Sequence, residues 1–273
     1  MLLITGAEGQ LGRELSTLLP EALTTDVSSL DITDSDAVAA FVKEHKIDTI
    51  INCAAYTAVD NAEKEPEPAE RINVIGPRNL ARSGAKIIHI STDYVFDGCA
   101  CRPYLETDTP HPVSVYGKTK LAGEEAVLHE AESAIILRTA WLYSPYGRNF
   151  VKTIRRLGAE QQKLQVVYDQ IGTPTYAADL AQAIVDILPQ FEQGHRGVYH
   201  YSNLGVCSWY DFAVEILNFS GLKCPVEPVE SSEYASAAKR PGYSVLNKSK
   251  IISQFKINIP YWKESLKKCL TRY

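Results

Sequence analysis

A tyrosine and a lysine stand four residues apart in the segment Tyr116-Gly-Lys-Thr-Lys120. Positions i and i+4 of a helix share one face, so both side chains can point into one cleft. A phenol normally titrates near pH ~10, and a nearby cation favours its ionised form. The pair is therefore suited to giving a proton to a carbonyl group while a cofactor gives a hydride. On its own the pattern is more often a surface pair on a solvated helix, so its meaning depends on the rest of the chain.

A glycine-rich turn, Gly6-Ala-Glu-Gly-Gln-Leu-Gly12, follows the first apolar run and opens a helical pattern. Glycines allow a tight turn and the close approach of a pyrophosphate, and a helix N-terminus offers free N–H groups. The spacing is G-x-x-G-x-x-G rather than G-x-G-x-x-G, and a plain glycine turn is the alternative. We predict a dinucleotide site here, with the cofactor against Gly6, Gly9, Gln10 and Leu11.

Acidic residues near this turn bear on the choice of cofactor. Asp26 follows the second predicted strand, where a carboxylate can bond the adenosine ribose and repel a 2′-phosphate. Glu8 adds negative charge in the glycine turn, although Arg13 lies just beyond it. Asp31 can accept from the adenine amino group or can simply precede a helix. The cofactor is therefore NADH or NADPH, and the charges favour NADH.

Short apolar runs alternate with helical patterns through the first half of the chain. Strands are predicted at 1–5, 22–25, 49–54, 86–91, 134–138, 164–168 and 197–201. Helices are predicted at 12–19, 35–44, 67–81, 116–129, 179–188, 208–218 and 262–270. Strands that alternate with helices favour parallel pairing, and near-continuous apolar strands suit a sheet covered on both faces.

We therefore predict an α/β fold, a Rossmann-like doubly wound parallel sheet with a smaller C-terminal substrate-binding domain. The dinucleotide-binding domain is expected to span residues 1–140, and a later segment at about 176–200 returns to it. Residues 141–273 are expected to form mainly the substrate-binding domain.

Two further segments are expected at the carboxyl edge of the sheet, where ligands of open parallel sheets bind. Asn52-Cys-Ala-Ala-Tyr-Thr57 ends the third strand, and its small residues Ala54 and Ala55 let a cofactor pass close to the backbone. The fourth strand ends at Ser91 and Thr92, and a hydroxyl from either can bond a substrate carbonyl.

Composition excludes several classes of partner. The chain has 273 residues and a formal net charge of −5, which argues against nucleic acid as a partner. It contains no apolar run long enough to predict a membrane span, and its N-terminus resembles a strand rather than a signal peptide. The six cysteines lack a paired zinc spacing, so we expect free thiols in a reducing cytoplasm.

Taken together, these segments resemble the extended short-chain dehydrogenase/reductase family, and the likeness covers nearly the whole chain. The segments that follow in the family's order are 6–12, Ala54-Ala-Tyr-Thr57, Ser91-Thr-Asp-Tyr-Val-Phe96, Tyr116-Gly-Lys-Thr-Lys120, Arg138-Thr-Ala-Trp-Leu-Tyr143, Asp169-Gln-Ile-Gly-Thr-Pro-Thr175 and Lys239-Arg-Pro241.

The resemblance implies reduction of the C4 ketone of dTDP-6-deoxy-L-lyxo-4-hexulose, the last step of dTDP-L-rhamnose synthesis. Tyr116 is then the proton donor, Lys120 lowers the tyrosine pKa and bonds the nicotinamide ribose, and Thr92 bonds the carbonyl oxygen. Cofactor contacts are also implied for Ile32 and Thr57. The implied substrate contacts are Thr92, Asp93, Tyr94 and Trp141 at the sugar, and Lys239 and Arg240 at the diphosphate.

Other readings stay open at this point. Another nucleotide-sugar epimerase, dehydratase or reductase of the same superfamily could carry these motifs, and so could a cofactor-binding regulatory subunit without catalysis, such as the relative that regulates methionine adenosyltransferase. Some family members hold magnesium at a dimer interface, but the sequence shows no cluster of ligands that demands a metal, and none is predicted. The expected assembly is a monomer or a homodimer.

Overall fold

The computed structural model describes residues 1–233 and 237–273. Its first part contains β1 (Leu2–Thr5), α1 (Gln10–Leu18), β2 (Leu23–Thr25), α2 (Ser35–Glu44), β3 (Thr49–Asn52), α3 (Val59–Ala62), α4 (Pro66–Glu70), α5 (Gly76–Arg82), β4 (Lys86–Thr92), α6 (Val115–Glu130) and β5 (Ala134–Thr139). The remainder contains β6 (Leu142–Tyr143), α7 (Phe150–Glu160), β7 (Leu164–Val167), β8 (Ile171–Gly172), β9 (Thr175–Tyr176), α8 (Ala177–Ile187), β10 (Arg196–His200), β11 (Cys207–Ser208), α9 (Trp209–Phe219), β12 (Val226–Val229), α10 (Ser249–Phe255) and α11 (Trp262–Leu270).

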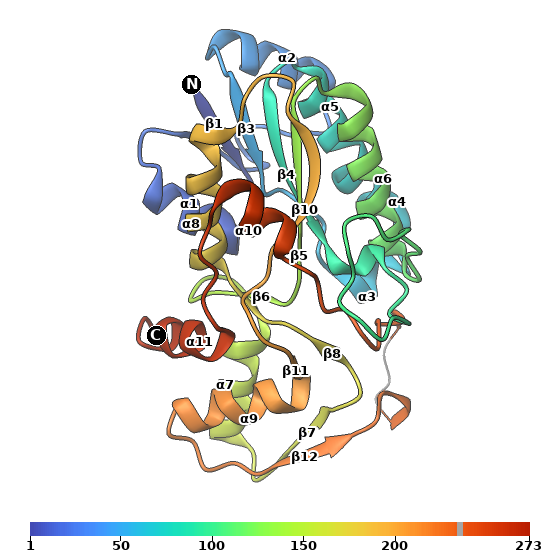
Figure 1. The fold of residues 1–273 in the computed structure, drawn as a ribbon, viewed down its shortest axis with the longest axis vertical. Coiled ribbons are helices and arrows are strands. Elements are labelled where there is room, and N and C mark those ends of the chain that lie inside the picture. The colour runs from blue at the N-terminus through green and yellow to red at the C-terminus, as the bar shows by residue number, and fades with distance from the viewer. Residues whose placement is uncertain (234–236) are drawn as a thin grey trace.

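A six-stranded sheet in the order β10-β5-β4-β3-β1-β2 forms the upper part of the molecule in Figure 1. All of its strand pairs are parallel, so every carboxyl end lies along one edge. The chain runs outward from β1 to β2 and then resumes with β3 on the other side of β1. This reversal creates a crevice between β1 and β3 at the carboxyl edge. The predicted Rossmann-like α/β fold is confirmed.

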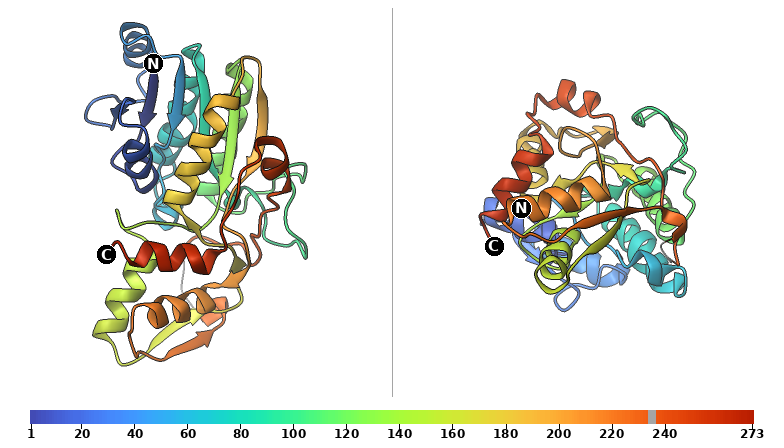
Figure 2. Two further views of the ribbon diagram at one scale, coloured as in Figure 1. Left: turned by 60° about the vertical axis from the view of Figure 1, so that its left-hand side comes forward. Right: turned by 90° about the horizontal axis from the view of Figure 1, so that it is seen from below.

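Apolar residues on both faces of the sheet explain why helices cover both sides (Figure 2). On one face, Ile4, Ile51 and Ile135 pack against α1, α8 and α10. On the other face, Leu3 and Ile50 pack against α2, α5 and α6. Burial on both faces fixes the direction in which each strand presents its side chains.

A second, smaller group of elements lies beyond the carboxyl edge of the sheet (Figure 1). It consists of α7, α9, α11 and the short parallel pair β7–β12, built around Phe212, Trp262 and Leu266. Between β9 and β11 the chain returns to the sheet, where α8 packs on α1 and β10 pairs with β5.

The helix predicted as one unit at 67–81 is interrupted in the structure. Residues Arg71–Ile75 form a π-helical segment between α4 and α5. The segment turns Asn73 inward, so that its amide accepts from Tyr56 N at 2.9 Å and donates to Thr119 Oγ1 at 3.1 Å. Such wide turns insert one residue into a helix and are frequent beside functional sites, and no periodicity of the sequence reveals them.

Candidate active site

Helix α6 carries the tyrosine and lysine that were predicted to share one face. Ser114 caps the helix by accepting a hydrogen bond from Gly117 N at 3.1 Å. A Cβ on Gly117 would lie 2.2 Å from Tyr94 O, so only glycine lets the helix approach the end of β4 this closely. Tyr116 is 9% exposed and Lys120 1% exposed, so the pair is buried against the sheet rather than placed on the surface.

The two hydroxyls at the end of β4 have different partners. Ser91 Oγ donates to Glu124, whose carboxylate also receives two nitrogens of the buried Arg138 side chain. Thr92 Oγ1 donates to Asp93 Oδ1 at 3.0 Å, and its hydroxyl lies close enough to the Tyr116 phenol to act on the pKa of that group. Of the two candidates for the substrate carbonyl, the structure therefore places Thr92 beside the tyrosine.

These groups line a cavity of about 190 Å³ at the carboxyl edge of the sheet. Its wall contains Thr92, Asp93, Tyr94, Tyr116, Lys120 and Trp141, which are the predicted catalytic residues together with the predicted sugar contacts. The Tyr94 ring meets the Tyr116 ring edge to face, with 5.5 Å between centroids.

Burial dominates the electrostatics of this cavity. It raises the pKa of Tyr116 to about 12, against the lowering effect of the Thr92 hydrogen bond. The net shift is therefore opposite to the lowering expected from Lys120, because burial dominates; Lys120 Nζ donates to Ile90 O at 2.7 Å. Burial also lowers the pKa of Lys120 to about 8, while nearby Glu124 acts in the opposite direction.

Asp93 is a buried carboxyl that faces the same cavity. Burial raises its pKa to about 6, although hydrogen bonds from Ser244 and Thr92 act to lower it. Its Oδ2 atom has no hydrogen-bond partner among the described residues. A buried acceptor without a partner is costly, so this oxygen is ready to bind a hydroxyl group of a ligand.

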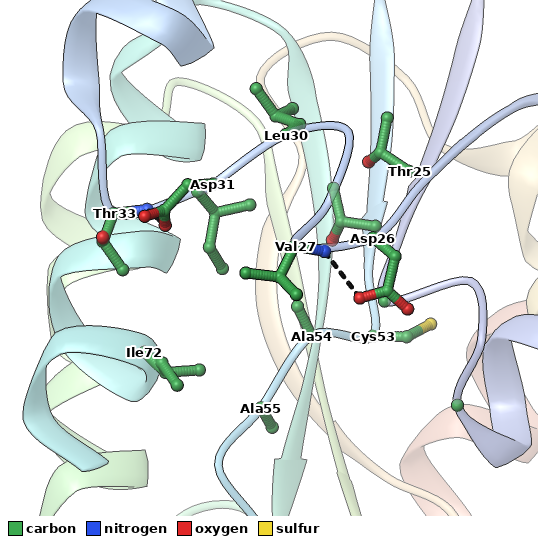
Figure 3. Close-up of a pocket in the computed structure, with 14 residues that line it drawn as sticks. Thr25, Asp26, Val27, Leu30, Asp31, Thr33, Cys53, Ala54, Ala55 and Ile72 are labelled. Carbon is green, nitrogen blue, oxygen red and sulfur yellow. Dashed lines mark hydrogen bonds between the residues drawn. The ribbon is translucent and has the colours of Figure 1, made fainter. Parts of the chain in front are cut away.

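A second cavity, of about 270 Å³, lies at the reversal point of the sheet (Figure 3). Asp26 and Asp31 stand on opposite sides of it, and Ala54 and Ala55 line its floor toward the first cavity. The backbone N–H of Thr33 donates to Asp31 and lowers the pKa of that carboxyl. Ile32 also lines this cavity, as predicted from the resemblance.

The glycine turn shapes the end of this cavity next to α1. Gly6 has φ of +67°, and a Cβ there would lie 2.7 Å from Ala54 N. Gly6 and Gly9 both line the cavity. Within the described ranges, no side chain caps the first turn of α1, which leaves its N–H groups available to an anion. The donor set and the adjoining acidic wall fit the pyrophosphate and adenosine of a dinucleotide.

Three predicted cofactor residues lie elsewhere. Gln10 directs its side chain to Ser144 and Asn149, whereas the Leu11 side chain belongs to the core, so only their backbone N–H groups can face a pyrophosphate. Thr57 is exposed and lies outside both cavities. Cys53 and Ala55 line both cavities, so the cavity that contains Asp26 adjoins the one that contains Tyr116, and together they are called the crevice below.

The predicted diphosphate residues take different positions. Arg240 Nη2 bonds Asp60 Oδ2 at 2.7 Å and lines a third cavity of about 320 Å³. Lys239 is exposed and lies outside the three cavities. The third cavity is formed mainly by α7 and β7 and includes Trp209, whose indole is stacked on Trp141.

Some lining residues were missed by reasoning from the sequence. Trp209 lines the third cavity and stacks directly on Trp141, yet the two positions lie 68 apart in the sequence and only the tertiary fold brings them together. Ile72, in the π-helical segment, lines the second cavity, the one that contains Asp26 and Asp31. No sequence motif marks this position. Cys53 joins the two cavities, and its position next to Ala54 could have indicated this role.

The chain is similar to known proteins over its whole length. The family model described as RmlD substrate binding domain matches residues 1–273. A protein of Aggregatibacter actinomycetemcomitans named dTDP-4-dehydrorhamnose reductase is 43% identical over 97% of this chain and 97% of its own. A crystal structure of a dTDP-4-dehydrorhamnose reductase from Clostridium acetobutylicum has a TM-score of 0.95 at 46% identity, covering 99% of this chain and 98% of that one. A dTDP-4-dehydrorhamnose reductase from Bacillus anthracis, in complex with NADP, has a TM-score of 0.95 at 43% identity, covering 100% and 99%.

Proposed function

The chain belongs to the RmlD substrate binding domain family, and on that premise we propose that it reduces the C4 ketone of dTDP-6-deoxy-L-lyxo-4-hexulose to give dTDP-L-rhamnose. It is an oxidoreductase that uses a nicotinamide cofactor. The observation that carries the proposal is that Tyr116 and Thr92 line one cavity, and that this cavity adjoins a second one whose glycine turn and acidic wall suit a dinucleotide.

Each residue of the cavity has a distinct task in this reaction. Tyr116 donates its phenolic proton to the oxygen that develops negative charge at C4. Thr92 bonds the same oxygen and holds the ketone in line. A bound reduced nicotinamide supplies the hydride. A positioned proton donor is typically worth ~10²–10⁴-fold in rate, and the alignment of the reacting atoms supplies much of the rest.

Lys120 is the cation of the site. Its Nζ lies under the end of β4, where it donates to Ile90 O. We propose that it bonds the nicotinamide ribose when the cofactor is present, since Lys120 lines the cavity next to the Cys53 and Ala55 junction. From there its charge stabilises the tyrosinate that remains after proton donation.

We propose NADH as the preferred cofactor. Asp26 and Asp31 both line the second cavity, where we place the adenosine of the cofactor. The described lining of that cavity includes no lysine or arginine. A 2′-phosphate placed near Asp26 meets like charge, whereas ribose hydroxyls can donate to it. The Bacillus anthracis relative is described in complex with NADP, so NADPH is the cofactor against which NADH has to be compared.

The nucleotide sugar is proposed to extend from Tyr116 past Trp141 toward Arg240. Asp93 and Tyr94 are placed to contact the sugar, and the stacked indoles of Trp141 and Trp209 form the wall beside it. Arg240 lines the third cavity, where a guanidinium can bond the diphosphate. Lys239 is kept as a weaker diphosphate contact from the exposed side of the same loop.

The six cysteines are all free thiols, and we propose a reducing compartment, the cytoplasm, as the place of action. In the part of the chain that the structure describes, helices are too short or too polar to cross a membrane. Metal-ligand clusters are likewise absent from the described residues. The protein is proposed to act as a monomer or a homodimer.

The test is to mix the purified protein with NADH or NADPH and dTDP-6-deoxy-L-lyxo-4-hexulose and to follow absorbance of the reduced nicotinamide. The expected result is oxidation of the cofactor with formation of dTDP-L-rhamnose, identified by NMR against its C4 epimer. Absence of oxidation with both cofactors would remove the reductase function. Tight cofactor binding without turnover would favour a regulatory subunit instead.

A further inference from the structure

A buried row of polar side chains runs beneath the crevice, and the proposed reaction does not use it. Thr5, Asn52 and His89 are Cα partners on the adjacent strands β1, β3 and β4. All three are almost completely buried. The row ends at Lys120, whose Nζ lies 3.4 Å from His89 Nε2. A buried histidine is thus in contact with the cation of the active site.

The hydrogen bonds of Asn52 determine which way its amide faces. Its Oδ1 atom accepts from Thr5 Oγ1 at 2.8 Å and from Ala54 N at 3.1 Å. Two donors on one atom identify that atom as the oxygen, so Nδ2 is the group that faces His89 Nδ1 at 2.9 Å. Because Nδ2 can only donate, His89 Nδ1 must accept, and the single hydrogen of the neutral ring is then assigned to Nε2.

His89 is held in its neutral form. Burial lowers its pKa well below 6.5, and the charge of Lys120 acts in the same direction. The Nε2 hydrogen therefore points toward Lys120 Nζ. An N–H group that faces an ammonium repels it, whereas an N–H group that faces the lone pair of an amine forms a hydrogen bond. The other Lys120 contact, donation to Ile90 O, is available to both forms.

Two other titratable groups face Lys120. Glu124, one turn along α6, favours the ammonium, but its carboxylate is already paired with Arg138 of β5. Cys53, at the end of β3, stays neutral because burial raises the pKa of its thiol to about 12. The N–H group of His89, on β4, therefore disfavours the ammonium form of Lys120, and burial of the amine disfavours that form further.

We propose that His89 is a positioning residue for Lys120: Asn52 fixes its ring with the hydrogen on Nε2, and this N–H holds the lysine against β4 and makes its ammonium easier to deprotonate. Lys120 then gains and loses a proton within the working pH range. The inference rests on the proposed reductase function for its catalytic meaning, but its physical content concerns the protein alone.

The experiment is NMR on the whole protein labelled with ¹⁵N-histidine and ¹³Cε-lysine, with Lys120→Met used to assign the signal. We expect the wild-type His89 ring to show the Nε2–H form, and Lys120 to titrate well below the ordinary lysine value of ~10.4. In Asn52→Asp a carboxylate accepts from Nδ1, so the ring hydrogen moves to Nδ1 and a bare Nε2 accepts from the ammonium. The Lys120 midpoint should rise by one pH unit or more, a tenfold change in proton affinity.

Asn52→Leu separates this route from the direct effect of an added charge. It removes the Nδ2 donor without adding a carboxylate, and the Lys120 midpoint should rise here too, by a smaller amount. Thr5→Val is the matched control, because Ala54 N still fixes the amide and the histidine form and lysine midpoint should stay in place.

A wild-type ring with its hydrogen on Nδ1 would overturn the proposal. So would a lysine midpoint that moves in Asn52→Asp but not in Asn52→Leu, since direct charge would then account for the shift. The alkaline limb of the kcat profile should move with the lysine midpoint. If the wild-type protein fails to reduce the ketone, the reductase function is lost while the NMR result still decides the role of His89.

Discussion

Ser91 lines the same cavity as its neighbour Thr92, but its hydroxyl hydrogen is already given to the buried carboxylate of Glu124. The acceptor is itself buried and holds a second donor, the Arg138 guanidinium, in a bidentate pair. Adjacent hydroxyls at one strand end thus separate into a structural group and a reacting group.

We therefore expect Thr92→Val to lower the catalytic rate and Ser91→Ala to lower the stability of the fold. Loss of the Thr92 hydroxyl removes a donor to the developing oxyanion, and kcat should fall ~10²-fold or more. Loss of the Ser91 hydroxyl leaves Glu124 with one donor fewer, so the free energy of unfolding should fall by ~1–3 kcal/mol while kcat stays within a few-fold. Steady-state kinetics and urea unfolding of both variants check this, and equal kcat losses would contradict the division.

Tyr116→Phe should lower kcat by ~10²–10⁴-fold, because it removes the proton donor while keeping the ring that packs on Tyr94. NADH affinity, measured by fluorescence titration, should stay close to that of the wild type. Tyr261→Phe, at an exposed position outside the crevice, is the matched control. Near-full turnover of Tyr116→Phe would mean that the proton comes from another group.

Asp26→Asn should improve the use of NADPH relative to NADH. The change removes a negative charge beside the expected 2′-phosphate, and the ratio of kcat/KM values should shift toward NADPH by about tenfold, equivalent to ~1.4 kcal/mol. Asp31→Asn, on the opposite wall of the cavity, should affect both cofactors alike. An unchanged ratio in Asp26→Asn would place the selection elsewhere.

Asp93→Asn should stabilise the protein at alkaline pH. The folded pKa of about 6 lies above the ordinary 3.8, so ionised Asp93 penalises the folded state, and this penalty develops as pH rises from about 4 to 6. The urea midpoint of the variant should exceed that of the wild type at pH 8, and the difference should shrink toward pH 4. Asp108→Asn should shift the midpoint the other way at pH 8, because Arg102 lowers the pKa of that carboxyl.

Arg240→Ala should raise KM for the nucleotide sugar by about tenfold or more, since charge-assisted hydrogen bonds contribute ~1.5–3 kcal/mol. Lys239→Ala should have a smaller effect, because Lys239 is exposed and Arg240 lines the third cavity. NADH affinity should be unchanged in both. An equal or larger rise in KM for Lys239→Ala would reverse their assignment.

Local signals in the sequence were sufficient for the elements and for the central pair. The helix at Ser35–Glu44 has the bounds that its periodicity predicts, with Asp34 as its cap. Tyr116 and Lys120 share a helix face because their spacing dictates it. The parallel pairing of the strands followed from their alternation with helices.

What the sequence could not predict depends on distance through space. The direction of the Tyr116 pKa shift is set by burial, which no spacing reveals. The contact between His89 and Lys120 depends on how α6 sits on β4, and the amide that fixes the histidine lies on a third element, β3. Lys239 and Arg240 are neighbours in the chain, yet the turn of their loop sends them to different surroundings.

The return of the chain to the sheet through α8 and β10 has a consequence for engineering. A chimera joined to a relative at residue 140 would pair β5 from one parent with β10 from the other, and would rest α1 of the first on α8 of the second. The hydrophobic core beneath α1, α8 and α10 would then combine side chains from two different parents. Exchange of substrate preference between relatives is therefore better attempted by transplanting 141–176, 201–245 and 256–273 together, leaving the sheet and its covering helices to a single parent.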